Sequence, residues 1–211
     1  HRAAAARDDP ERDLRLVEFD QAALSQLLTP TDTRVAPARL HGRPALRLET
    51  GHKEPWPGIT VKAPQTRWDL SPYALLVAPV RNAGSNSVTL HCRVDNPGAD
   101  GIRACLTRSV TLAPGATNVL RVDLRRAGES RLGDRLFGMR GYPVAAGGEG
   151  TINPSNVTQF LVFVSKPESD HAFEVGEFVA TGTYTPPTAW VKDADPFIPF
   201  IDTFGQYRHK N

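Results

Sequence analysis

The sequence lacks long apolar runs, and it lacks a marked net charge. None of its apolar stretches reaches the roughly 18 residues that a membrane-spanning helix needs. Its 25 Lys and Arg residues nearly balance its 23 Asp and Glu residues, which gives a formal net charge of +2. Such a balance provides no general attraction to nucleic acid or to an anionic membrane, and we expect neither as a partner.

Cysteine is scarce, with two residues in a chain of 211, so the sequence predicts no disulfide framework. Cys92 and Cys105 flank a predicted turn, and they could face each other across two strands. In the alternative interpretation each is a small buried apolar side chain. Both interpretations stay open, because the register of a hairpin is not fixed by its sequence.

Recognisable catalytic motifs are missing as well. The sequence contains no GxSxG, P-loop, HExxH or paired CxxC motif. Carboxylates are plentiful, but a glycosidase needs two of them about 5 to 10 Å apart across a cleft, and the sequence does not locate such a pair. We therefore expect the chain to be non-catalytic.

Short segments of alternating apolar and polar residues dominate what is present. Period-two alternation predicts strands with one face on a core, and the 17 Gly and 18 Pro residues favour many turns over long helices. The clearest examples are Leu46 and Leu48, Ile59 and Val61, Val88 to Val94, and Leu120 to Leu124. The pattern predicts an all-β fold, an antiparallel β-sandwich or jelly roll over residues 14–184.

Two runs, Tyr73 to Val80 and Phe160 to Val164, are nearly all apolar. They predict central strands that are covered on both faces, although a buried helix has the same appearance. The Asn-Pro-Gly-rich segment 96–101 predicts a hairpin turn between two strands. Residues 21–28 form the one segment with a helical pattern, and it is short.

The two ends of the chain differ from the middle. Residues 1–13 are rich in Ala, Arg and Asp and read as a flexible N-terminal end. Residues 185–211 form an extended C-terminal tail, which reads as a linker toward a further domain. The tail is too aromatic to remain in water, so we expect it to pack on a protein surface. Its aromatic residues are Trp190, Phe197, Phe200, Phe204 and Tyr207.

A sugar-binding surface needs an aromatic side chain that stacks on a pyranose, with planar polar side chains beside it. Trp56 lies in a Pro-Trp-Pro-Gly turn, which favours exposure, whereas Trp68 at a strand entry fits a core position better. His91 and Arg93 share one strand face, which is either a binding face or simply the solvent side. The carbohydrate-binding candidates are Trp56, His91, Arg93, Asn96, Arg140 and Tyr142.

Acidic residues on the predicted strands raise the possibility of a structural calcium ion. Calcium prefers hard oxygen ligands, and sugar-binding jelly rolls often hold one between their first and last strands. The candidate ligands are Glu18, Asp20, Glu49 and Glu177, which are otherwise ordinary exposed acids.

Several segments together resemble the N-terminal carbohydrate-binding-like module of agarase-like glycoside hydrolases, including family 50. The resemblance spans about residues 14 to 211. It is carried by residues 52–61 (HKEPWPGITV), 68–73 (WDLSPY), 80–84 (VRNAG), 93–101 (RVDNPGADG), 136–142 (LFGMRGY), 156–167 (NVTQFLVFVSKP) and 199–211 (PFIDTFGQYRHKN).

The resemblance implies a galactose-binding-like jelly roll ahead of a catalytic (β/α)₈ barrel, in a secreted or periplasmic hydrolase of agar-type galactans. The barrel and its two catalytic glutamates lie outside this chain. The module would bind or position galactan, or alternatively dock on the catalytic domain without binding sugar. One departure weakens the calcium site, because Gly176 stands where such modules often have aspartate in their last strand.

Overall fold

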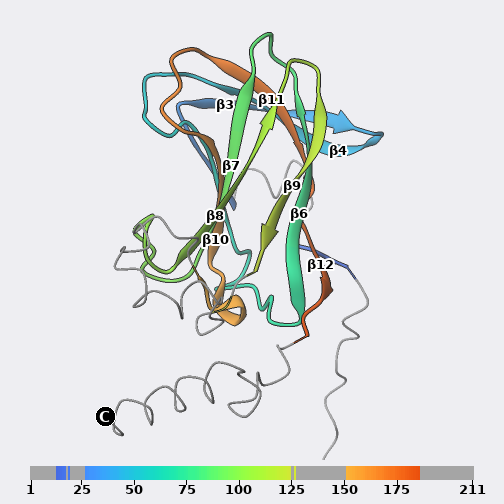
Figure 1. The fold of residues 1–211 in the computed structure, drawn as a ribbon, viewed down its shortest axis with the longest axis vertical. Coiled ribbons are helices and arrows are strands. Elements are labelled where there is room, and N and C mark those ends of the chain that lie inside the picture. The colour runs from blue at the N-terminus through green and yellow to red at the C-terminus, as the bar shows by residue number, and fades with distance from the viewer. Residues whose placement is uncertain (1–12, 18, 20–26, 125, 127–150, 186–211) are drawn as a thin grey trace, which may run out of the picture.

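The computed structural model describes residues 13–17, 19, 27–124, 126 and 151–185, which form two antiparallel sheets packed face to face (Figure 1). The predicted antiparallel β-sandwich is therefore confirmed. Within these ranges, no helix is long and apolar enough to cross a membrane.

The two sheets are built from strands that are distant in the sequence. In the first sheet β6 is central: β9 pairs with one of its edges, and β12 and β11 share the other. The strands of the first sheet are β1 (Leu14–Arg15), β3 (Thr33–Leu40), β4 (Arg43–Thr50), β6 (Tyr73–Asn82), β9 (Thr117–Asp123), β11 (His171–Gly176) and β12 (Val179–Thr183). The second sheet has the order β2-β5-β10-β7-β8. Its strands are β2 (Leu28–Thr31), β5 (Gly58–Lys62), β7 (Val88–Asp95), β8 (Cys105–Leu112) and β10 (Gln159–Val164).

Both apolar runs form central strands, as predicted, but they are not covered on both faces. Along β10, buried residues alternate with half-buried ones, and most of β6 follows the same rule. The runs look continuous because outward positions are apolar too, as at Leu161 and Phe163. The expectation of two covered faces was therefore wrong, and the difference leaves apolar side chains on the outside of the sandwich.

Turn residues set the hairpins. His41 and Gly42 connect β3 to β4 with φ of 52° and 78°, the left-handed pair that a two-residue type I′ turn requires. The predicted hairpin after Asp95 is confirmed, because β7 and β8 pair along their whole length.

The core between the sheets is aromatic at its centre. The Phe160 ring lies 5.5 Å from the Trp68 ring and 4.3 Å from the Phe178 ring, and all three residues are buried. Trp68 is thus a core residue, as its position at a strand entry suggested.

The two cysteines are free and buried. Cys105 lies opposite Asp95 on the outward side of the second sheet, whereas Cys92 points into the core opposite Arg108. Because the two thiols are on opposite faces of the sheet, they form no disulfide, and each is a small buried side chain.

Some sequence-based predictions concern residues outside the described ranges. These include the tail aromatics, most of the candidate helix, Glu18, Asp20, Arg140 and Tyr142. Leu28, the last residue of the candidate helix, is instead the first residue of β2.

Candidate functional site

The outward face of the second sheet gathers the polar and aromatic side chains that the core excludes. The strand register places Phe163 of β10 directly opposite His91 of β7. The two rings stack, with centroids 5.2 Å apart and planes inclined by 16°. On the other side of Phe163 lies Gly58 of β5. A side chain at Gly58 would collide with the backbone of β10, so glycine permits the close approach of the two strands.

Trp56 lies on the same face. Two backbone hydrogen bonds extend the β5–β10 ladder past Gly58, from the amides of Val164 and Lys166 to the carbonyls of Pro57 and Pro55, at 3.0 and 2.7 Å. Because side chains alternate along such a ladder, Trp56 shares the face of Phe163. Trp56 is 56% exposed, which is unusual for so large an aromatic residue. We call Trp56, Phe163 and His91 the aromatic row.

The loop that carries the exposed indole is held in place at several points. The Asp32 carboxylate accepts hydrogen bonds from the amides of Lys53 and Glu54, at 2.9 and 3.2 Å. His52 Nδ1 lies 2.6 Å from Asp170 Oδ1, which connects the loop to the β10–β11 connection. An aromatic side chain on a loop fixed in this way loses little conformational freedom when it binds a ligand.

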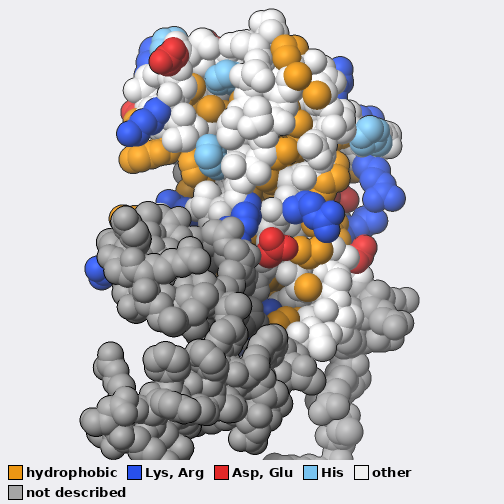
Figure 2. Space-filling view, viewed as in Figure 1, with side chains coloured by type: hydrophobic (Ala, Val, Ile, Leu, Met, Phe, Trp, Pro, Cys, Tyr) orange, Lys and Arg blue, Asp and Glu red, His pale blue; other side chains and the backbone are white. Residues whose placement is uncertain are grey.

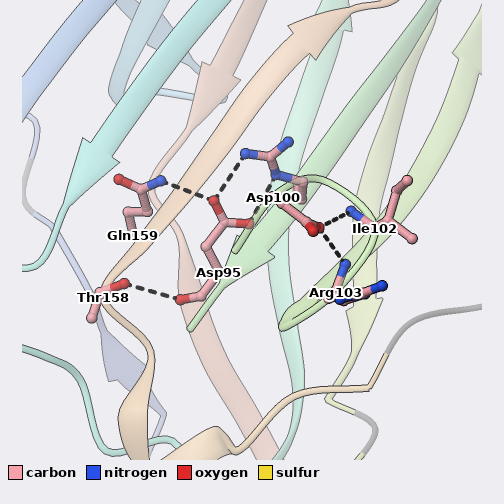
Figure 3. Close-up of polar contacts among 7 residues, drawn as sticks. Asp95, Asp100, Ile102, Arg103, Thr158 and Gln159 are labelled. Carbon is pink, nitrogen blue, oxygen red and sulfur yellow. Dashed lines mark hydrogen bonds and ion pairs between the residues drawn. The ribbon is translucent and has the colours of Figure 1, made fainter. Parts of the chain in front are cut away.

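A polar network borders the aromatic row on β7 (Figure 3). Arg93 donates two hydrogen bonds to Asp95, from Nε to Oδ1 at 2.8 Å and from Nη2 to Oδ2 at 3.0 Å. Gln159 donates to Asp95 Oδ2 at 2.9 Å. Asp95 is only 1% exposed, so this carboxylate fixes the guanidinium rather than meeting a ligand. Arg93 therefore presents a planar, oriented cation beside the row.

The β7–β8 loop adds a rim next to Arg93. Asp100 Oδ1 accepts hydrogen bonds from the amides of Ile102 and Arg103, at 2.9 and 2.6 Å, which lower the pKa of its carboxyl group (Figure 3). The backbone at Gly101 lies so close to Nη1 of Arg93 that a side chain there would crowd it.

Hydroxyl groups complete the surface. On either side of the aromatic row the outward positions of the sheet are mostly threonine and serine, which donate and accept hydrogen bonds. These residues are Thr29, Thr60, Thr107 and Ser109.

Among the sequence-based sugar-binding candidates, the structure brings Trp56, His91 and Arg93 onto one face. The side chain of Asn96 instead binds a neighbouring loop of this chain. Its amide nitrogen donates to the carbonyls of Asn153 and Asn156 at 2.9 and 2.7 Å. Its side-chain oxygen accepts the amide of Asn153 at 2.6 Å. Asn96 thus anchors the segment that holds the 3₁₀ turn η1 (Pro154–Asn156), and its side-chain amide is fully engaged there.

Sequence reasoning missed Phe163, the centre of the row. Phe163 was assigned to a strand covered on both faces, because the run around it is apolar throughout. The signal that points to it is its even spacing from Leu161, which sets it apart from the core residues Phe160 and Val162.

The described acidic candidates for calcium are engaged in ion pairs. Glu49 lies 3.0 Å from Arg47 and 3.6 Å from Arg34, and Glu177 lies 3.8 Å from Arg15. Within the described part of the chain, no group of three or more His, Cys, Asp or Glu residues could hold a metal ion.

The burial of two histidines makes the stability of the fold depend on pH. It lowers the pKa of His91 in the aromatic row, and it lowers the pKa of His171 at the start of β11. As the pH falls below the ordinary histidine pKa of about 6.5, these two histidines therefore bind protons in the unfolded chain before they do so in the folded protein. Proton binding to the unfolded chain lowers the free energy of unfolding. We expect the midpoint of thermal unfolding to fall between pH 7 and pH 5, and the variant His91→Gln to show a smaller fall. Equal falls in both proteins would contradict the burial of His91.

The fold is shared with solved carbohydrate-active proteins. An agarase, AgWH50C, matches 83% of this chain with a TM-score of 0.59 at 15% sequence identity. An exo-beta-agarase matches 82% with the same TM-score and identity. The chain spans 25% of the length of either agarase. A family 11 carbohydrate-binding module from Clostridium thermocellum, in complex with a beta-1,3-1,4-mixed-linked tetrasaccharide, matches 82% with a TM-score of 0.52 at 12% identity.

That family 11 module is matched over 98% of its own length, so this chain has the fold of a complete module of that kind. The resemblance to agarase-like hydrolases is confirmed as a likeness of fold to one quarter of those chains. No family model and no curated protein matches the sequence.

Proposed function

We propose that this chain is a non-catalytic carbohydrate-binding module, and that its aromatic row stacks on the sugar rings of a polysaccharide. The observation that carries the proposal is the exposed indole of Trp56, on an anchored loop at the same face as the stacked pair Phe163 and His91. Arg93 and the neighbouring hydroxyl groups supply hydrogen bonds to sugar hydroxyls. The likeness of fold to a module solved with a bound tetrasaccharide supports this assignment.

The ligand is best matched by a neutral polymer, and an agar-type galactan is the first candidate. Basic and acidic side chains occur together on the face seen in Figure 2, in keeping with the formal net charge of +2. This surface gives no general steering toward sulfated or uronate polymers. The likeness of fold to two agarases makes an agar-type galactan the first polymer to test, with mixed-linked glucan, the ligand of the family 11 module, as the second. Open surfaces of this kind bind with dissociation constants of millimolar to micromolar order, roughly 4 to 8 kcal/mol.

The described strands of this surface offer no pair of carboxyl groups such as a glycosidase uses. Retaining and inverting enzymes both need two carboxyl groups across the scissile bond. Asp95 is the one carboxylate in the five described strands of this sheet, and Arg93 and Gln159 occupy it. We assign any catalysis to a domain outside this chain, in a larger secreted or periplasmic glycoside hydrolase.

Affinity electrophoresis tests the binding function. The protein should migrate more slowly in a native gel that contains agarose than in a gel without polysaccharide. Retardation by mixed-linked glucan instead would correct the ligand but keep the function. Unchanged migration with both neutral polymers, and with a sulfated galactan, would reject it.

Docking on a catalytic domain is the second candidate, and one observation favours it. The outward face of the first sheet carries an apolar strip whose most exposed member, Val119, is 44% exposed. The strip comprises Leu75, Val77, Pro79, Val119 and Val179. If all polysaccharides fail in the gel, a Val119→Asp variant that weakens binding to a separately produced catalytic domain would support docking.

A further inference from the structure

A hollow lies apart from the aromatic row, at the end of the first sheet where β3 begins and β4 ends. It is open to solvent and has a volume of about 530 Å³, within the range of small-ligand sites. Three small residues, Gly51, Gly84 and Ala172, line the hollow together with polar residues. Ala172 lies between Glu49 of β4 and the β6–β7 turn. The amide of Ala83 in that turn donates to the carbonyl of Ala172 at 2.9 Å.

The walls of the hollow are polar, and their charged residues are Asp32, Arg34, Glu49 and Asp170. Arg34 faces Glu49 at 3.6 Å, and His52 faces Asp170 at 2.6 Å. Asp32 uses Oδ2 to accept the amides of the neighbouring loop, as described above. Three carboxylates and one guanidinium line the hollow, so it is rich in hydrogen-bond acceptors for the hydroxyl groups of an uncharged ligand and disfavours an anionic one.

The β6–β7 turn forms the opposite wall of the hollow, and side-chain hydrogen bonds fix it. Asn86 donates to Ser169 Oγ at 2.9 Å, and Asn82 donates to the Asn86 carbonyl at 2.8 Å. Asn82 also accepts the amide of Gly84 at 2.9 Å, so the turn that lines the hollow is fixed before any ligand arrives. A wall with fixed hydrogen-bonding groups loses little freedom on binding.

We propose that this hollow is a second binding site, specific for the hydroxyl edges of a neutral sugar residue. No Phe, Trp or Tyr is among its described lining residues and His171 is the one ring there, so a sugar residue is recognised mainly through its hydroxyl groups. An exposed sugar at a chain end offers more hydroxyl groups than an internal residue, and we assign the hollow to chain ends. The site goes beyond the proposed function, because it shares no side chain with the aromatic row.

Two-dimensional NMR of the ¹⁵N-labelled protein separates the two sites. The probes are galactose, an agar-derived neutral tetrasaccharide and a mixed-linked glucan tetrasaccharide. We expect at least one probe to shift the amide signals of Gly51, Gly84 and Ala172, and the shift to survive Phe163→Ala. Ala172→Leu fills the hollow with a larger apolar side chain and should weaken this binding at least about tenfold.

Ala36→Leu is the matched control, since Ala36 lies on the same outward face but does not line the hollow. Its binding at the hollow should equal that of the unmodified protein. The proposal is overturned if no probe shifts these amides, or if Ala172→Leu binds as well as Ala36→Leu. Shifts that vanish with Phe163→Ala and persist with Ala172→Leu would also overturn it, while supporting the aromatic row.

Discussion

Trp56→Ala should lower the affinity for neutral polysaccharide about tenfold, and the double variant Trp56→Ala/Phe163→Ala should abolish retardation in the affinity gel. Aromatic contacts contribute about 0.5–1.5 kcal/mol each beyond the area that they bury, so removal of a single ring is worth about one order of magnitude. Because Trp56 is 56% exposed and lies outside the buried core, its removal should leave the free energy of unfolding nearly unchanged.

Val119→Ala provides the control for Trp56→Ala. It removes an exposed apolar side chain from the other sheet, so it should bind polysaccharide like the unmodified protein. Equal losses of affinity in both variants, or full affinity of Trp56→Ala, would contradict a role of Trp56 in binding polysaccharide.

Asp95→Ala should have the largest effect on stability among the polar substitutions, a loss of about 3 kcal/mol or more. It leaves the guanidinium of Arg93 without its carboxylate and the amide of Gln159 without its acceptor, on a surface where both are partly buried. Urea denaturation measures the loss as a fall in the midpoint of about 1 to 3 M, at an unchanged slope.

Asp123→Ala serves as the comparison, because Asp123 is an exposed carboxylate near the end of β9. Its substitution should change the free energy of unfolding by no more than about 0.5 kcal/mol. Similar midpoints for Asp95→Ala and Asp123→Ala would show that the Arg93 network does not hold the sheet together. Weakened sugar binding by Asp95→Ala at temperatures where it remains folded would show that the network also orients Arg93 for the ligand.

The sequence was most informative about the fold. Alternation such as Val88 to Val94 fixes which side chains face the core, and the turn at 96–101 separates two strands where the structure has them. Even the assignment of Trp68 to the core followed from its place before a strand. These features are local, because they depend on residue spacing and turn chemistry within a few positions.

The site was only partly predictable, because it depends on which strands become neighbours. His91 and Trp56 were recognised as candidates, but their relation requires β10 to lie between β5 and β7. Phe163 was hidden inside an apolar run, and Asn96 looked like a ligand-binding residue until its contacts with the η1 turn were seen. Register between distant strands is a property of the packed sheet, and no spacing within one segment reveals it.

The most direct test of the central claim is an NMR titration that maps where a polysaccharide fragment binds. With a neutral agar-derived tetrasaccharide, the largest amide shifts should fall at Gly58, His91, Arg93 and Phe163, with a shift of the Trp56 indole N–H. Shifts of these signals by the mixed-linked glucan tetrasaccharide alone would correct the ligand and keep the surface. If neither fragment shifts them at millimolar concentrations, the outward face of the second sheet is not a carbohydrate-binding surface.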